Sequence, residues 1–263
     1  MFFTSIAART DLGLVRAGNE DSGLHHSNLI AVADGMGGAV GGEVASKIAI
    51  HTLAARIELF GASAIDDDSR IDMLSNTLIA IESELSLRIN ENPELNGMGT
   101  TLTALMPIAS SMAMLHVGDS RAYRLRKGEL TQLSHDHTVV QELLDQGKIT
   151  TAEIAEHPQR SMLTQALMGK SGNDSHLENY PIQLFPIEKG DIYLVASDGL
   201  TAVLNDEMIQ KVLLATPLDQ AANNLITMVR DGGAPDNVTI VLAEVGGKAP
   251  TADELSLLGA AYE

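Results

Sequence analysis

Short apolar runs alternate with longer helical patterns along the chain of 263 residues. Continuous or alternating apolar residues, bounded by glycine and polar residues, are typical of strands. The predicted strands are Phe3–Arg9, Leu29–Ala33, Thr101–Leu105, Met112–Val117, Ala122–Arg126, Leu130–Leu133, Ile192–Ala196 and Val238–Val245. Strands therefore stand at both ends of the chain, which does not fit a series of βαβ units.

Helical spacing of apolar residues predicts two helices between the second and third strands, one from Glu43 to about Leu59 and one spanning Ile71–Leu85. Another helix begins at Pro217 and ends before Gly232. The predicted fold is α+β, an α-β-β-α sandwich in which two antiparallel sheets pack together and helices cover the outer faces. Residues 247–263 are expected to form a tail or a small peripheral helix with little to anchor it.

Composition narrows the classes of protein that fit this pattern. The formal net charge of −18 excludes sequence-independent binding to nucleic acid or to anionic membranes, both of which need a basic surface. The chain has no cysteine, so disulfides, thiolate zinc sites and cysteine nucleophiles are excluded. No secretory signal and no apolar run of about 20 residues is found, which favours the cytoplasm.

Four aspartates stand where an apolar strand meets a loop: Asp34, Asp119, Asp198 and Asp236. Each alone is explained as simply by a turn, since Asp-Gly pairs are common there. Together, converging carboxylates would repel one another unless they were protonated or neutralised by cations. A set of oxygen ligands without sulfur suits Mg²⁺ or Mn²⁺, so the pattern indicates a metal site.

Two glycine- and charge-rich loops support such a site. The glycines of Asp34–Gly38 allow the backbone to approach a ligand closely, just before a predicted helix. The loop Arg16–Asp21 combines one arginine with two acids, and a guanidinium can hold a phosphate through two parallel hydrogen bonds.

These motifs, in this order, resemble one family, the PPM-type (2C-type) metal-dependent protein serine/threonine phosphatases in their compact bacterial form. The matching segments are Arg16–Ser22, Val32–Gly38, Gly97–Thr101, His116–Tyr123, Asp136–Thr138, His157–Arg160, Ala196–Gly199 and Pro235–Thr239. The resemblance implies a single catalytic domain over 1–246, in which residues from about 135 to 180 form a flap beside the active site.

The resemblance also implies direct metal contacts for five residues. Asp34 corresponds to the carboxylate that bridges two metals, and the Gly35 carbonyl to a ligand of one of them. Asp198 and Asp236 correspond to ligands of the other metal. Asp119, with Asp198, corresponds to the acids that hold a third, weaker ion. The implied cofactors are therefore two core Mn²⁺ or Mg²⁺ ions and a third.

Other roles follow from the same resemblance. Glu20 and Asp21 would act through metal-bound waters, and Arg16 would bind the substrate phosphate. A metal-activated water would hydrolyse phosphoserine or phosphothreonine on proteins without a phosphoenzyme. The implied partners are phosphoprotein substrates and an opposing bacterial serine/threonine kinase, with the phosphatase acting as a monomer in the cytoplasm.

The chain departs from the family pattern at two positions, and these leave the general acid unknown. Ala39 replaces a histidine of many bacterial relatives, and Met36 replaces a histidine proposed as general acid in animal members. A metal-bound water is the preferred proton donor. His135, His137 and His157 are further candidates.

Two alternatives stay open. The first is a catalytically silent phosphatase fold that serves as a regulatory or binding module, although the core aspartates are retained. The second is another phosphoryl-transfer enzyme or hydrolase. Gly169–Ser171 matches the end of a P-loop, but Thr164 replaces its first glycine. Gly97–Gly99 lacks the last glycine of a dinucleotide-binding fingerprint. An aspartyl-phosphate enzyme needs its acids just after a strand, whereas Asp66–Asp68 lies in a polar loop. No serine-hydrolase Gly-x-Ser-x-Gly elbow is present.

Overall fold

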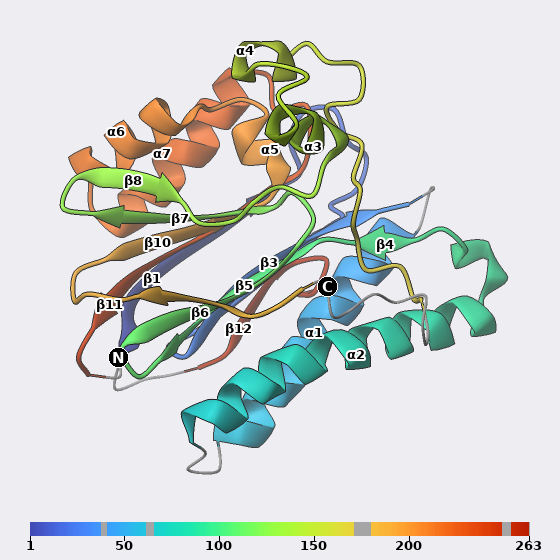
Figure 1. Cartoon of the computed structure of the whole chain (residues 1–263), viewed down its shortest axis with the longest axis horizontal. Coiled ribbons are helices and arrows are strands. Elements are labelled where there is room, and N and C mark those ends of the chain that lie inside the picture. Colours follow the sequence, from blue (N-terminus) through green and yellow to red (C-terminus); the bar gives the residue numbers. More distant parts are fainter. Residues whose placement is uncertain (38–40, 62–65, 171–179, 249–253, 263) are drawn as a thin grey trace.

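Two antiparallel sheets pack face to face, and helices cover the outer face of each (Figure 1). The computed structural model describes residues 1–37, 41–61, 66–170, 180–248 and 254–262. One sheet has five strands in the order β1-β11-β10-β7-β8. Its strands are β1 (Phe2–Asp11), β7 (Arg121–Arg126), β8 (Glu129–Gln132), β10 (Ile192–Ala196) and β11 (Val238–Gly246).

The second sheet has seven strands, six of them in the order β12-β2-β3-β5-β6-β9, while β4 pairs with the end of β3. Its strands are β2 (Asp21–His26), β3 (Leu29–Met36), β4 (Gly99–Thr100), β5 (Leu102–Ile108), β6 (Ser111–Val117), β9 (Gln183–Pro186) and β12 (Ser256–Gly259).

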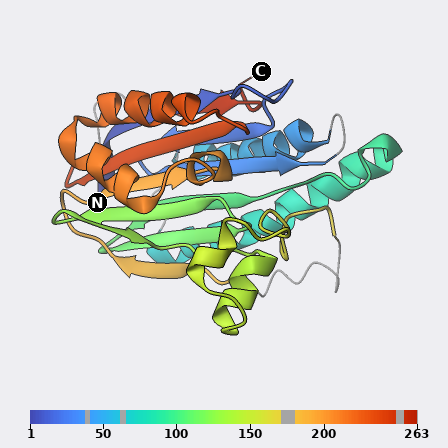
Figure 2. The same cartoon turned by 90° about the horizontal axis from the view of Figure 1, so that it is seen from above.

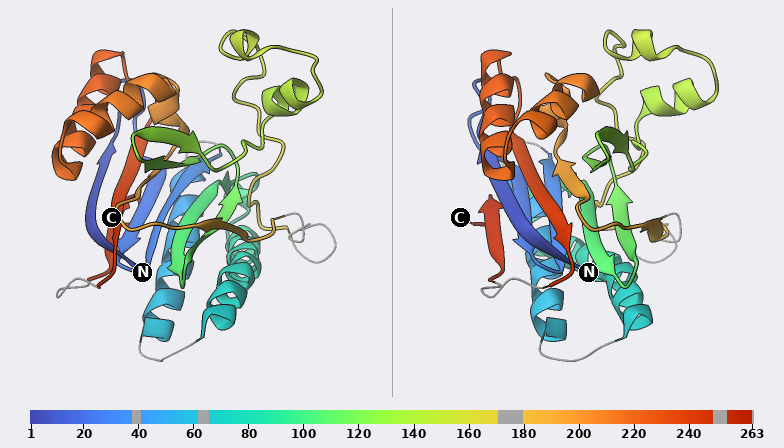
Figure 3. Two further views of the ribbon diagram at one scale, coloured as in Figure 1. Left: turned by 60° about the vertical axis from the view of Figure 1, so that its left-hand side comes forward. Right: turned by 90° about the vertical axis from the view of Figure 1, so that its left-hand side faces the viewer.

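The helices fall into three groups, which the turned views separate (Figures 2 and 3). The pair α1 (Gly42–Gly61) and α2 (Asp67–Glu91), followed by the short 3-10 turn η1 (Pro93–Leu95), covers the seven-stranded sheet. The five-stranded sheet is covered by α5 (Asp198–Thr201), α6 (Asp206–Ala215) and α7 (Leu218–Asp231). The short helices α3 (Val139–Asp145) and α4 (Thr151–Ile154) project from one end of the sandwich.

The first five residues of β3, Leu29–Ala33, are apolar at every position rather than at alternate ones. Successive side chains of a strand point to opposite faces. Ile30 and Val32 pack between the sheets, in one cluster with Val241 of β11. Leu29 and Ala31 pack on the other side, in the cluster that includes α1 and α2. Because both faces of this run are buried, Asp34, which follows it on β3, is held in place by the core on either side.

The α+β sandwich with two helix-flanked antiparallel sheets is the predicted fold and is confirmed. The expectation of a tail or peripheral helix over 247–263 is wrong for residues 256–259, which form β12 and pair with Ser22–His25 at the sheet edge. Strands β2 and β9 and helix α6 were also absent from the sequence prediction. In the described part of the chain, no helix has both the length and the apolar content to cross a membrane.

Candidate metal and phosphate site

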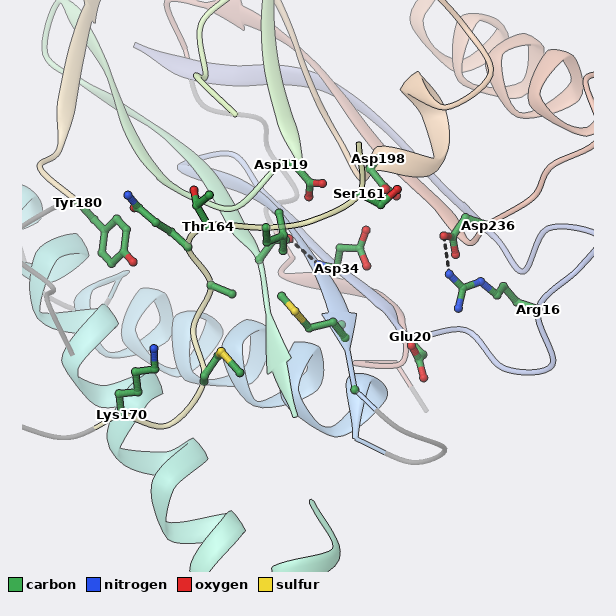
Figure 4. Close-up of a pocket in the computed structure, with 18 residues that line it drawn as sticks. Arg16, Glu20, Asp34, Asp119, Ser161, Thr164, Lys170, Tyr180, Asp198 and Asp236 are labelled. Carbon is green, nitrogen blue, oxygen red and sulfur yellow. Dashed lines mark hydrogen bonds and ion pairs between the residues drawn. The ribbon is translucent and has the colours of Figure 1, made fainter. Parts of the chain in front are cut away.

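The four strand-end aspartates meet at one end of the sandwich, around a single pocket (Figure 4). Asp34 lies on β3 and Asp119 follows β6, so both come from the seven-stranded sheet. Asp198 follows β10 and Asp236 precedes β11, so both come from the five-stranded sheet. The pocket has a volume of about 720 Å³ and draws its carboxylates from both layers.

Nearly all residues with a predicted site role line this pocket. They are Arg16, Glu20, Asp34, Gly35, Asp119, Asp198 and Asp236. Asp21 lies behind the pocket wall instead, 1% exposed, and its Oδ2 accepts a hydrogen bond of 2.7 Å from the Ser197 hydroxyl. Burial raises the pKa of Asp21 to about 7, although its hydrogen bonds lower it.

The backbone around Asp34 is fixed by hydrogen bonds across the seven-stranded sheet. Asp34 N–H donates to Thr101 Oγ1 at 2.9 Å, and Thr101 N–H donates back to Asp34 O at 2.9 Å. Gly35 N–H donates to Glu20 O at 3.1 Å. Gly35 also has no room for a side chain, because a Cβ would lie 2.0 Å from Gly42 O. The close approach of these loops therefore requires glycine at this position.

Mutual repulsion and burial dominate the electrostatics of the pocket. Burial, with the charges of Asp21 and Asp198, raises the pKa of Asp34 well above its ordinary value. Burial and the charge of Asp198 raise the pKa of Asp119 to about 7. Burial and the charge of Asp236 likewise raise the pKa of Asp198. Carboxyls in such a cluster resist ionising together unless a cation shares the site.

Two unpartnered oxygens show where positive charge would be accommodated. Asp198 Oδ1 and Asp21 Oδ1 are buried and have no hydrogen-bond partner among the described residues. A buried acceptor left unpaired costs about 1–3 kcal/mol, and more when it is charged. Oxygen donors without nitrogen or sulfur are the ligands that Mg²⁺ and Mn²⁺ prefer. The residues present therefore fit a divalent metal.

The carboxylates are not already drawn together as a ligand cage. Within the described ranges, no three Asp, Glu, His or Cys side chains are grouped tightly enough to hold an ion. One of them, Asp236, is engaged instead through its Oδ2 by Arg16 Nη2 at 2.6 Å. The Arg16 side chain is 48% exposed. The hydrogen bond that Arg16 donates to Asp236 raises the pKa of Arg16, so the guanidinium keeps its charge at the pocket rim.

The three candidate histidines do not line the described part of the pocket. His135 Nε2 lies 2.8 Å from Asp145 Oδ2, outside it. His137 Nδ1 accepts a hydrogen bond from Gly118 N–H at 3.0 Å, and His157 Nδ1 accepts one from Gln159 N–H at 3.2 Å. Their roles in these contacts are structural. Met36 does line the pocket, while Ala39 is outside the described residues.

One wall of the pocket comes from a part of the chain that residue patterns do not mark. It is formed within the predicted flap by Ser161, Leu163, Thr164, Gln165, Ala166, Met168, Lys170 and Tyr180. These residues show no clear alternation of polar and apolar positions and no metal-ligand spacing. Their order in the sequence therefore does not identify them as part of a site. The family resemblance predicts only that this region, as part of the flap, lies beside the active site.

A pocket of half-buried carboxylates with an arginine at its rim, between two antiparallel sheets, is typical of a metal-dependent phosphatase. The family model described as protein phosphatase 2C matches residues 19–233 of the chain. The chain belongs to this family.

Relatives of the chain extend the similarity over most of its length. "Serine/threonine protein phosphatase PstP" of Mycobacterium tuberculosis is 42% identical over 242 residues, which are 91% of this chain and 44% of PstP. The chain thus spans less than half the length of that relative. "Serine/threonine phosphatase stp" of Listeria monocytogenes is 34% identical, with 90% of this chain and 94% of the relative covered.

Solved structures agree with this assignment. The crystal structure of the M. tuberculosis phosphatase PstP/Ppp superposes with a TM-score of 0.84 at 39% identity, over 94% of this chain and all of that one. The PstP catalytic domain in complex with two manganese ions superposes with a TM-score of 0.82 at 38% identity, over the same shares.

Proposed function

We propose that this chain hydrolyses phosphoserine and phosphothreonine on proteins, with Mn²⁺ or Mg²⁺ held by the carboxylates of the pocket. The observation that carries the proposal is the meeting of four buried or half-buried aspartates and one exposed guanidinium in a single pocket. The names of the relatives and the manganese-bound PstP domain support the same activity and the same class of metal.

The proposed metal-ligand roles are those that the family resemblance assigns to the residues at the strand ends. The Asp34 carboxylate and the Gly35 carbonyl would hold the first core ion, and Asp198 and Asp236 the second. Asp119 would share a third ion with Asp198. Divalent ions supply Lewis-acid activation of a water nucleophile and neutralise negative charge on the phosphoryl oxygens.

Arg16 is placed to bind the substrate phosphate. Its guanidinium has five N–H donors in a fixed fork, and its contact with Asp236 uses only one of its terminal nitrogens. A phosphate at the rim would be held by the remaining donors, which orient it in line with the attacking water. Water adds to phosphorus, the bond to the serine or threonine oxygen breaks, and that oxygen takes up a proton.

No histidine lines the described part of the pocket, so the proposed proton source is a carboxyl of the site or a water molecule. The substrate itself must come from a reaction that transfers phosphate to serine or threonine hydroxyls, so a serine/threonine kinase is the proposed opposing enzyme. Cytoplasmic location and the monomeric state stay predictions.

Asp34→Asn tests the proposal because it removes one charge and keeps the shape of the side chain. We expect at least a 100-fold loss of Mn²⁺-dependent hydrolysis of a phosphothreonine peptide. Without metal, this variant should be as stable as the wild type or more stable, since one repelling charge is gone. Asp72→Asn, an exposed change on α2, is the control and should alter neither property.

Full activity of Asp34→Asn would contradict the metal assignment. A wild-type protein that binds a phosphopeptide tightly but shows no turnover in Mn²⁺ would instead favour the silent binding module. Trapping of a covalent phosphoenzyme would exclude direct attack by water.

A further inference from the structure

Hydrogen bonds tie the flap wall of the pocket both to the rest of the flap and to the catalytic sandwich. Val139 N–H donates to Met162 O at 2.9 Å, and Thr164 N–H donates to His137 O at 2.9 Å. Leu167 is fully buried and exchanges two hydrogen bonds of 2.9 Å with Thr100, next to the strand that carries Asp34. The wall over residues 161–170 therefore has a fixed position relative to the carboxylates.

A buried glutamate on α2 fixes the far end of this wall. Glu82 is 3% exposed, and its carboxylate accepts hydrogen bonds from Met168 N–H at 3.3 Å and Lys170 N–H at 2.7 Å. Between them, Gly169 has a φ of 72°, and a Cβ there would lie 2.8 Å from Ser86 N. Glycine at this position therefore allows the backbone of the wall to pack closely against α2, where the Glu82 carboxylate accepts its hydrogen bonds.

The Glu82 carboxylate has no part in the proposed chemistry, and it is nevertheless buried. A buried acid is costly unless hydrogen bonds compensate for its lost hydration. Here burial raises the pKa of Glu82, and the backbone N–H groups of Lys170 and Met168 lower it again. Both residues that donate to it line the pocket. What the glutamate positions is therefore the pocket end that carries Lys170.

That end of the pocket differs in charge from the rest. Arg16 and Lys170 are the two cationic side chains among the described lining residues, and Arg16 already contacts Asp236. Figure 4 shows Lys170 and Tyr180 on one side of the pocket and the carboxylates on the other. Across the described ranges, no carboxylate forms an ion pair with the Lys170 ammonium.

Tyr180 adds a hydrogen-bond donor on the same side of the pocket as this lysine (Figure 4). Its residue exposure is 9%, and its ring lies 5.9 Å from the ring of His137, measured between centroids. Burial and the charge of Glu82 raise the pKa of Tyr180, which keeps the phenol protonated. An ammonium and a phenolic O–H together suit a carboxylate, which accepts from both.

We propose that Lys170 and Tyr180 form a subsite for an acidic side chain of the substrate, close to the phosphorylated residue, and that Glu82 is its positioning residue. The inference rests on the proposed phosphatase function, since it concerns the same pocket. It runs against the bulk charge of −18, which repels acidic peptides at every position alike. A subsite must therefore appear as a preference at one position only.

The test uses a phosphothreonine peptide in which glutamate or lysine replaces a neutral residue at each flanking position in turn. For the wild type with Mn²⁺, we expect glutamate at one position to raise kcat/KM by up to about fivefold, mostly through KM, as one exposed ion pair allows. Lys170→Glu should reverse the preference at that position. Lys148→Glu, an exposed flap change of equal charge outside the pocket, should leave it unaltered.

Glu82→Gln tests the positioning role, with the exposed Glu84→Gln on the same helix as its control. The glutamine amide places an N–H donor opposite a backbone N–H, so the preference for glutamate should fall by a larger factor than the rate of p-nitrophenyl phosphate hydrolysis does. Equal loss with both substrates would overturn the positioning role.

The outcomes separate the two levels of inference. If the wild type hydrolyses the peptides but glutamate gives a uniform decline at all positions, or if Lys170→Glu leaves the preference unchanged, the subsite is refuted and the phosphatase function stands. If the wild type hydrolyses no phosphopeptide, the proposed function itself fails.

Discussion

Asn237 holds together the loops that carry the two ends of the proposed site. It is 4% exposed, and its Oδ1 accepts a hydrogen bond from Glu20 N–H at 2.9 Å. Its Nδ2 donates to Leu12 O at 2.8 Å and to Gly18 O at 3.0 Å. One side chain next to Asp236 therefore fixes the whole loop in which Arg16 lies.

Asn237→Ala removes all three bonds and leaves their backbone partners unpaired. At about 0.5–1.5 kcal/mol for each hydrogen bond, the free energy of unfolding should fall by about 2–4 kcal/mol. With a urea m-value of about 3 kcal/mol/M for a chain of this size, a loss of about 3 kcal/mol lowers the urea midpoint by about 1 M. Displacement of Arg16 and Glu20 should also lower kcat/KM for a phosphopeptide by about 100-fold.

Two further variants separate the hydrogen bonds from the loss of side-chain volume. Asn237→Asp keeps the shape and the Oδ1 acceptor, but it turns an acceptor toward the two carbonyl oxygens, so it should destabilise the fold at least as much as alanine does. Asn90→Ala on the exposed surface of α2 should change the free energy of unfolding by less than about 0.5 kcal/mol. Either Asn237 variant with a wild-type urea midpoint and wild-type activity would refute the reasoning.

Three other predictions follow from the described structure. Gly199→Ala should cost at least about 2 kcal/mol in thermal unfolding, because its Cβ would lie 1.9 Å from Asn237 O; an unchanged melting temperature would contradict this. Burial lowers the pKa of His116 to about 3, so the contribution of this group to the free energy of unfolding should fall as pH drops from about 6.5 toward 3, by about 2 kcal/mol at pH 5. The raised pKa values of Asp21 and Asp119 act in the opposite direction over the same range, so the measurement is the difference in urea midpoint between the wild type and His116→Gln, which should shrink by this amount between pH 7 and pH 5. Mn²⁺ at about 100 times its Kd should stabilise the wild type by about 2.7 kcal/mol, and Asp34→Asn much less, by calorimetry.

The sandwich could be predicted because most of its strands have a local pattern of apolar residues in the sequence. A run such as Leu29–Ala33 is apolar at every position, and the structure explains this by burial of both faces of β3. Helix α6 also carries a local signal, because Asn205 caps it by accepting a hydrogen bond from Met208 N–H at 3.0 Å. By contrast, β12 is a four-residue strand that depends on its pairing with β2, which no local pattern reveals.

The site was predictable in its residues and not in its surroundings. Each aspartate could be placed at a strand end, but their meeting in one pocket depends on the order of strands in the two sheets. The flap wall depends on contacts between residues far apart in the chain, such as Glu82 with the backbone of Lys170. Hydrogen bonds to a backbone N–H place no demand on the side chain of the donor, so they leave no trace in the sequence of the wall.

The packing between the sheets has a direct consequence for the chemistry. Asp34 belongs to one sheet and Asp198 to the other, so the spacing of these carboxylates depends on how the sheets rest on each other. The layer between them is apolar and close to the site, with Val32 of β3 and Val195 of β10 in one buried cluster. Close-packed interiors transmit changes of volume as small shifts of backbone. The spacing of the proposed ligands therefore depends in part on residues such as Val32 and Val195, which do not line the pocket themselves.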